Sequence, residues 1–121
     1  MNPQQIINKM NQCLIKMQKG NVEYRSLGLK KAVAEEKYRV ALQKEMARLK
    51  LEGYRVTIIP DMARGNEEVA RLRLERDIAD VNYTVCRDSI RYNEKELEIL
   101  RSQLAWLKVE YKNSWLKSDM K

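Results

Sequence analysis

The fold is decided by residues 69–111, which read VARLRLERDIADVNYTVCRDSIRYNEKELEILRSQLAWLKVEY. Alternating steps of three and four residues from Val69 reach an apolar side chain at nearly every stop. Only Arg76 and Asn93 on this line are strongly polar. A seam of about six heptads predicts a coiled-coil helix, in which a lone polar residue such as Asn93 can fix the register. The seam consists of Val69, Leu72, Arg76, Ala79, Tyr83, Cys86, Ile90, Asn93, Leu97, Leu100, Leu104, Leu107 and Tyr111.

The same segment has a second apolar line, nearly opposite the first. If the seam occupies heptad positions a and d, this line occupies positions c and f. A helix that is apolar on two faces is expected to be covered on both. We therefore predict that the second line is an interface with an N-terminal helix, another copy of the chain or a foreign partner. Its interface residues are Leu74, Ile78, Val81, Val85, Tyr92, Ile99 and Trp106, with Val109 continuing the line.

The first line, which is the seam, needs a helical partner. An apolar stripe over residues 21–53 can supply this partner. Gly53 ends that stripe, and Asn66 has the side chain of a helix N-cap, followed by two glutamates that favour a helix start. These signals predict an antiparallel hairpin with a first arm over 21–53 and a second arm over 66–117. The stripe of the first arm consists of Leu27, Leu29, Val33, Ala34, Tyr38, Ala41, Leu42, Met46 and Leu49.

A further helix is predicted over 3–19, because Asn2 and Pro3 suit a helix start and apolar residues recur behind them. Gly20, within Lys19-Gly20-Asn21, predicts a break or kink before the first arm. The sequence thus predicts an all-α protein with one domain over 1–121. This domain is a long antiparallel coiled-coil hairpin with a short N-terminal helix, and we expect it to pack into an oligomeric helical bundle.

The connection over 54–65 contains the one β-like run of the chain, from Tyr54 to Ile59. Two interpretations remain open for it. An exposed strand edge would add to a partner's sheet, whereas a hydrophobic plug would cap the end of the hairpin. Val56, Ile58 and Arg64 are the candidate contact residues of this segment.

Positive charge is concentrated in the first half of the chain. The net charge is +7. Residues 1–60 hold 12 Lys and Arg against 5 Asp and Glu, whereas residues 61–121 hold 12 of each kind. A basic arm of this type can follow a phosphate backbone, and the alternative is a solvated helix face. The candidate nucleic-acid contacts are Lys30, Lys31, Lys37, Lys44 and Arg48.

Catalytic and metal-binding motifs are missing from the sequence. The chain has no histidine, and Cys13 and Cys86 lie far apart on apolar helix faces, so neither a catalytic residue nor a metal ligand is predicted. We expect a non-enzymatic protein without a cofactor or small-molecule substrate. No apolar run is long enough to cross a membrane, and the first residues do not resemble a secretion signal. These features favour a cytoplasmic location without membrane contact.

The stretch from Ile58 to Asn66, IIPDMARGN, and the Arg/Glu-rich helix that follows it to Ala79 resemble small helical-hairpin proteins of bacteriophages and prophages of Gram-positive bacteria. This resemblance implies a small accessory protein in the host cytoplasm that binds a host protein, a phage protein or DNA. The leading hypothesis is a protein–protein interaction module, such as a phage-encoded inhibitor or accessory factor. The alternative hypothesis is a nucleic-acid-binding factor of phage replication or recombination that uses the basic first arm.

Overall fold

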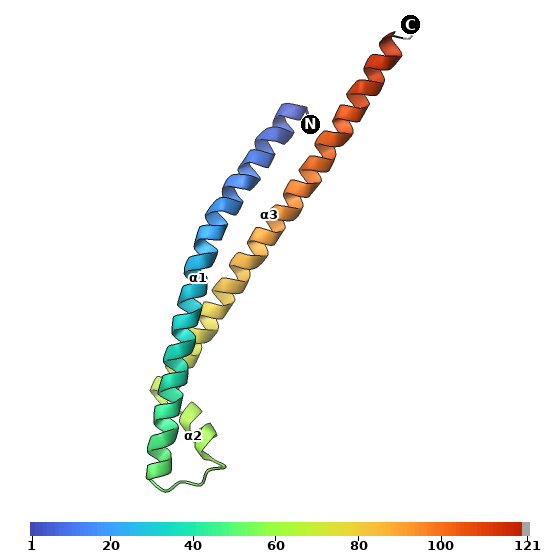
Figure 1. The fold of residues 1–121 in the computed structure, drawn as a ribbon. Coiled ribbons are helices and arrows are strands. Elements are labelled where there is room, and N and C mark those ends of the chain that lie inside the picture. Colours follow the sequence, from blue (N-terminus) through green and yellow to red (C-terminus); the bar gives the residue numbers. More distant parts are fainter. Residues whose placement is uncertain (120–121) are drawn as a thin grey trace. The chain divides into compact units, whose positions relative to one another are not determined.

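The computed structural model describes the backbone of residues 1–119 and the side chains of residues 1–116. Figure 1 shows three helices in the order α1 (Pro3–Leu51), α2 (Ile59–Arg64) and α3 (Glu67–Asp119). The long helix α1 packs against the long helix α3, and the short helix α2 lies between them in the sequence. The described part of the chain has no β-strand. The predicted all-α hairpin is therefore confirmed.

The helix ends follow the predicted signals. The Asn2 side-chain oxygen accepts the backbone N–H of Gln5 at 2.8 Å, and the Gln5 side chain accepts the backbone N–H of Asn2 at 3.0 Å. This reciprocal pair satisfies free donors at the start of α1. At the start of α3, the Asn66 side-chain oxygen accepts the backbone N–H groups of Glu68 and Val69 at 3.0 and 3.1 Å. Gly53 follows the end of α1 with φ of +90°, a conformation that favours glycine.

The predicted break near Gly20 is wrong, because α1 runs without interruption from Pro3 to Leu51. The proposed helix over 3–19 and the proposed arm over 21–53 are one helix. The reason is that Gly20 faces α3, where a Cβ atom built on it would lie only 3.0 Å from Cγ1 of Ile90. The missing side chain therefore makes room for Ile90, and the glycine is a packing residue within the helix.

The chain divides into two compact units. Unit 1 contains Met1–Val22 and the part of α3 from Arg87 onward, and unit 2 contains Glu23–Cys86. In unit 1, Ile6 and Cys13 of α1 are buried against Leu97 and Leu100 of α3. The partly buried side chains around this core are Met10, Met17, Leu104 and Leu107. The N-terminal part of α1 therefore covers the first seam of α3 and does not cover the second apolar line.

Unit 2 has two small buried clusters. Tyr38 of α1 packs with Val69 and Leu72 at the start of α3, and Leu49 packs with Ile59 and Ala63 of α2. The second cluster fixes α2 against the last turns of α1. Burial of each large apolar side chain contributes about 1.5–3 kcal/mol.

Aromatic and charged contacts extend the packing of unit 2. The hydroxyl groups of Tyr24 and Tyr83 are 2.5 Å apart, and their ring centroids are 4.5 Å apart. Lys31 forms a salt bridge with Asp80 at 3.1 Å and lies over the Tyr83 ring at 4.6 Å. Arg76 lies over the Tyr38 ring at 4.4 Å, so this polar position of the seam is filled by a cation–π contact.

The first seam of α3 is placed as predicted. From Val69 to Leu107, each of its residues is buried or partly buried, including Asn93 at 8% exposure, whereas Tyr111 is 75% exposed. Cys13 and Cys86 are buried free thiols. Burial raises the pKa of each thiol above its ordinary value, with nearby Glu96 adding to the shift at Cys13 and Glu23 adding to it at Cys86.

Candidate interaction surface

The second apolar line of α3 is exposed along its whole length. We call these eight residues the outer face of α3, and each is between 49% and 69% exposed. Unit 2 contributes Leu74, Ile78, Val81 and Val85, and unit 1 contributes Tyr92, Ile99, Trp106 and Val109. The sequence identified all of these residues, because they recur at steps of four and three from Leu74 to Val85 and at steps of seven from Val85 to Trp106.

The outer face of α3 lies opposite a seam that is already filled. Single exposed apolar residues are common on protein surfaces, but rows of large ones are usually interaction sites. The part of α1 that was a candidate cover, residues 3–19, packs on the first seam instead. Of the three predicted covers, another copy of the chain and a foreign partner remain.

The connection between α1 and α3 contains no strand, so the first of the two interpretations left open for it, an exposed strand edge, is wrong. Pro60 lies in the first turn of α2, where its fixed φ favours a helix, and the N–H of Ile58 bonds to the carbonyl of Arg55 at 3.1 Å in a turn. The alternative of a hydrophobic plug holds for Ile59, which is 4% exposed. It does not hold for Val56 and Ile58, which are 71% and 43% exposed.

The last candidate of the connection, Arg64, forms a salt bridge with Asp61 one turn earlier in α2, at 3.1 Å. Both side chains are on the surface. The pair therefore contributes to the local helix, as charged residues three apart commonly do.

The five candidate nucleic-acid contacts divide into two groups. Lys31 is paired with Asp80, and Arg48 forms salt bridges with Glu45 and Glu52. The hydrogen bond between Arg48 and Glu45 raises the pKa of the arginine and lowers that of the glutamate. The other three, Lys30, Lys37 and Lys44, are exposed, and none forms a salt bridge with any described residue.

These three lysines are spaced by seven residues and therefore lie along one side of α1, about 10.5 Å apart along its axis. We call them the lysine row. The sequence alone placed these lysines in one set with Lys31 and Arg48 as candidate nucleic-acid contacts. The heptad spacing of the lysines was the signal that separates the row from Arg48.

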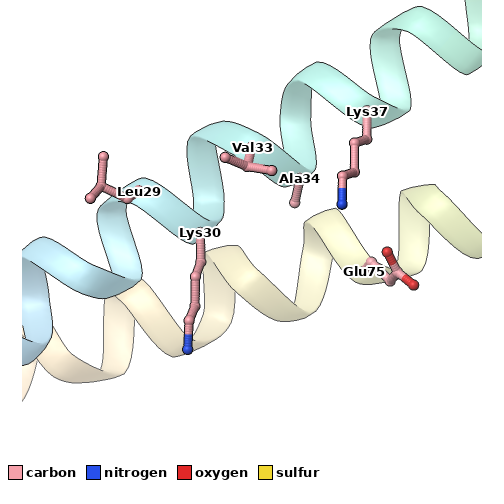
Figure 2. Close-up of a pocket in the computed structure, with 6 residues that line it drawn as sticks. All are labelled: Leu29, Lys30, Val33, Ala34, Lys37 and Glu75. Atoms are coloured by element: carbon pink, nitrogen blue, oxygen red, sulfur yellow. The ribbon is translucent and has the colours of Figure 1, made fainter.

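A groove of about 340 Å³ lies beside the lysine row in unit 2. Figure 2 shows Lys30 and Lys37 extending from α1 toward α3, where Glu75 lies, with Leu29, Val33 and Ala34 on the same stretch of α1. The groove thus combines apolar side chains with positive charge.

A second hollow of about 600 Å³ in unit 2 is lined by Lys37 and Lys44, and on α3 by Glu68, Arg71 and Glu75. Arg71 bonds to Glu68 at 2.6 Å and to Glu75 at 2.5 Å. The hydrogen bond from Arg71 lowers the pKa of Glu68. These charges are neutralised within α3, so this hollow is less suited to an anion than the lysine row is.

The described residues include no group of three or more His, Cys, Asp or Glu side chains arranged to hold a metal ion. Within the same part of the chain, no helix has a stretch apolar enough to cross a membrane. The two surfaces that remain as candidates are therefore the outer face of α3 and the lysine row of α1.

Comparison of the chain with protein-family models, with curated proteins and with solved structures finds no match. A function therefore has to be inferred from the two surfaces themselves.

Proposed function

We propose that this chain is a non-enzymatic protein–protein interaction module that binds a helix of its partner along the outer face of α3. The observation that supports the proposal is the row of eight large, exposed apolar side chains on a helix whose opposite face is already packed. Their spacing gives α3 a second apolar line, with two residues per heptad from Leu74 to Val85 and one per heptad from there to Trp106. A partner helix would insert its own apolar side chains between them.

The resemblance of residues 58–79 to phage hairpin proteins suggests what kind of partner this is. Under that resemblance, the bound helix belongs to a host or phage protein, and the module acts as an inhibitor or accessory factor. Its action requires binding alone. No bond has to be made or broken.

The test compares three forms of the tagged chain as bait in a bacterial lysate. Ile78→Glu/Val85→Glu places two carboxylates on the outer face of α3, where burial in an interface would leave them without partners. Arg73→Glu is the matched control, because it changes the net charge by the same amount at an exposed heptad position e, away from the outer face. We expect a protein that is captured by the wild type and by the control but not by the double variant. Equal capture by all three forms would contradict the proposal.

Binding of nucleic acid is a second candidate function, and the lysine row supports it. Three exposed ammonium groups at regular spacing on one helix side can contact phosphates without reading base sequence. Such a surface would suit a factor of phage replication or recombination.

This alternative is tested by fluorescence anisotropy of labelled single- and double-stranded DNA at rising salt concentration. Replacing Lys30, Lys37 and Lys44 by glutamine should weaken binding and reduce the slope of log affinity against log salt by about two to three. The control replaces Lys95, Lys108 and Lys112 of α3, which changes the net charge equally. Absence of binding by the wild type at low salt would remove nucleic acid from consideration.

A further inference from the structure

We propose that a second copy of this chain covers the unit 2 part of the outer face of α3, and that it does so with the lysine-flanked apolar side of its own α1. This inference rests on the proposed binding role of the outer face of α3. It names a second copy of the chain as an occupant of the unit 2 part of this face, in addition to the partner protein, and it states how the copies are joined.

The helix α1 has an outward apolar side of its own in unit 2. Leu29, Val33 and Val40 are 65%, 49% and 46% exposed, although the seam side of the same helix is packed. We call these three residues the outer face of α1. They lie at heptad positions c and f of α1, the same positions that form the outer face of α3. Leu29 and Val33 also line the groove in Figure 2.

Basic side chains flank the outer face of α1 on both sides. The lysine row follows one side, and Arg25 and Arg39, which are two heptads apart, lie on the other. Residues 23–51 hold eight Lys and Arg against four Glu. The outer face of α1 is thus an apolar strip inside a positively charged border, interrupted by Glu36.

Acidic side chains flank the outer face of α3 in unit 2. Glu75 and Asp77 border it at positions g and b, where Asn82 and Thr84 follow one heptad later. Within α3, Glu75 forms a salt bridge with Arg71 and Asp77 forms one with Arg76, and these surface pairs are weak enough to exchange partners when another copy brings its lysines close. No Lys or Arg occupies these bordering positions between 68 and 86. Residues 67–86 as a whole hold five Asp and Glu against three Arg.

The charged side chains beside each outer face determine which faces can pair. Two outer faces of α1 would place lysines against lysines, and two outer faces of α3 would place carboxylates against carboxylates. Only α1 of one copy against α3 of another places opposite charges beside a shared apolar strip, as flanking charges do when they select partners in coiled coils. Charge complementarity therefore favours a second copy, joined through unlike faces.

Unlike faces lead to assembly beyond a dimer. In unit 2, each outer face lies opposite the seam that joins α1 to α3, so the two outer faces point away from each other. A copy that uses its α3 face keeps its α1 face free for a third copy. Such a contact closes into a ring or continues as a filament.

The first test measures molar mass by light scattering and by sedimentation equilibrium over a range of protein and salt concentrations. We expect assemblies larger than two chains that dissociate as salt screens the flanking charges. A wild-type chain that stays monomeric up to high concentration at low salt would overturn the inference. The capture experiment with Ile78→Glu/Val85→Glu would still decide the proposed function separately.

The second test uses two variants that each remove one face. Val33→Glu disables the outer face of α1, and Val81→Glu disables the outer face of α3. Both positions are exposed, so far-UV circular dichroism and thermal melting should match the wild type. Each variant alone should stay monomeric at concentrations up to roughly tenfold above that at which the wild type is half associated, because association would bury an unpaired carboxylate.

Mixing the two variants gives the decisive result. Each then supplies the face that the other lacks, so the mixture should form a complex of two chains and grow no further. Self-association of the Val33→Glu variant alone would show that α3 pairs with α3 and would overturn the inference. Failure of the mixture to form a two-chain complex would overturn it as well.

Discussion

The two faces of α3 are similar in sequence but differ in the structure. The first seam and the outer face both repeat with the heptad, and both are rich in large apolar side chains, although the outer face has only one such residue per heptad between Val85 and Trp106. Within unit 1, Leu97 is 5% exposed, whereas Ile99, two residues away, is 59% exposed. The difference is that α1 supplies Ile6 and Cys13 to one face and nothing to the other.

This comparison shows what heptad periodicity can and cannot establish. It identifies which residues are suited to a helical contact, because side chains at these spacings share one face. It does not establish whether the partner is in the same chain. Substitutions that separate the two faces can therefore be ranked by how much packing each residue has within the chain.

The largest effect is expected at the first seam. Leu97→Ala should lower the free energy of unfolding by about 2–4 kcal/mol, because it leaves a cavity in the core of unit 1. Ile99→Ala is the matched control on the outer face and should change it by no more than about 0.5 kcal/mol. Urea denaturation at low protein concentration measures both values. Similar losses for the two variants would mean that the faces are not distinct.

The next largest effect is expected at Gly20, where the seam has no space for a side chain. Gly20→Leu should lower the free energy of unfolding by about 1–3 kcal/mol through overpacking against Ile90. Adding Ile90→Ala should recover part of that loss, so a double-mutant cycle should give a favourable coupling energy. Additive effects would show that Gly20 and Ile90 do not share this space.

A smaller effect of opposite sign is expected at Gly28. A Cβ atom there would lie 3.4 Å from Cε2 of Tyr83, which is an ordinary contact. Gly28→Ala should therefore raise the free energy of unfolding by about 0.5–1 kcal/mol through higher helix propensity. Thermal melting followed by circular dichroism measures the change. A loss of stability would mean that the Tyr83 ring cannot move to accept a methyl group.

The smallest effect concerns the charged border of the outer face of α3. Arg71 lowers the pKa of Glu68, so this carboxylate stabilises the fold most above its ordinary pKa of 4.5. That stabilisation is lost as the pH falls from there through the lowered pKa. The difference in melting temperature between wild type and Glu68→Gln should be small at pH 7 and should vanish in acid. A difference that grows in acid would contradict the assigned direction.

The sequence was sufficient to predict the hairpin, the Asn2 and Asn66 caps and which residues form the second apolar line of α3, whose role as an interface stays a prediction. Each of these depends on contacts within one or two helical turns, or on a periodicity that extends over many residues. The break at Gly20 was predicted wrongly because glycine has a low helix propensity. The steps of four and three from Ile6 continue through Gly20 to Tyr24, and that continuity indicates a seam position rather than a helix end.

The connection was harder to predict because its side chains suit two conformations. The run from Val56 to Ile59 favours a strand by composition, but a lone strand has no neighbour to bond with, and Pro60 favours a helix start. Which of these residues is buried depends on α2 packing against Leu49, which is a tertiary contact. The lysine row follows from the seven-residue spacing of its lysines alone, so the sequence was sufficient to find it.

The glycines of α1 also restrict how the two long helices can be aligned. Gly20 stands opposite Ile90, and Gly28 stands against Tyr83, so small residues on one helix receive large ones from the other. Sliding α3 by one heptad would bring Ile90 against Cys13 or Leu27 in place of a glycine, so Ile90 would lose the space that Gly20 leaves for it. These two pairs therefore favour one register of the hairpin, and they disfavour misaligned hairpins while the chain folds, without the help of a partner.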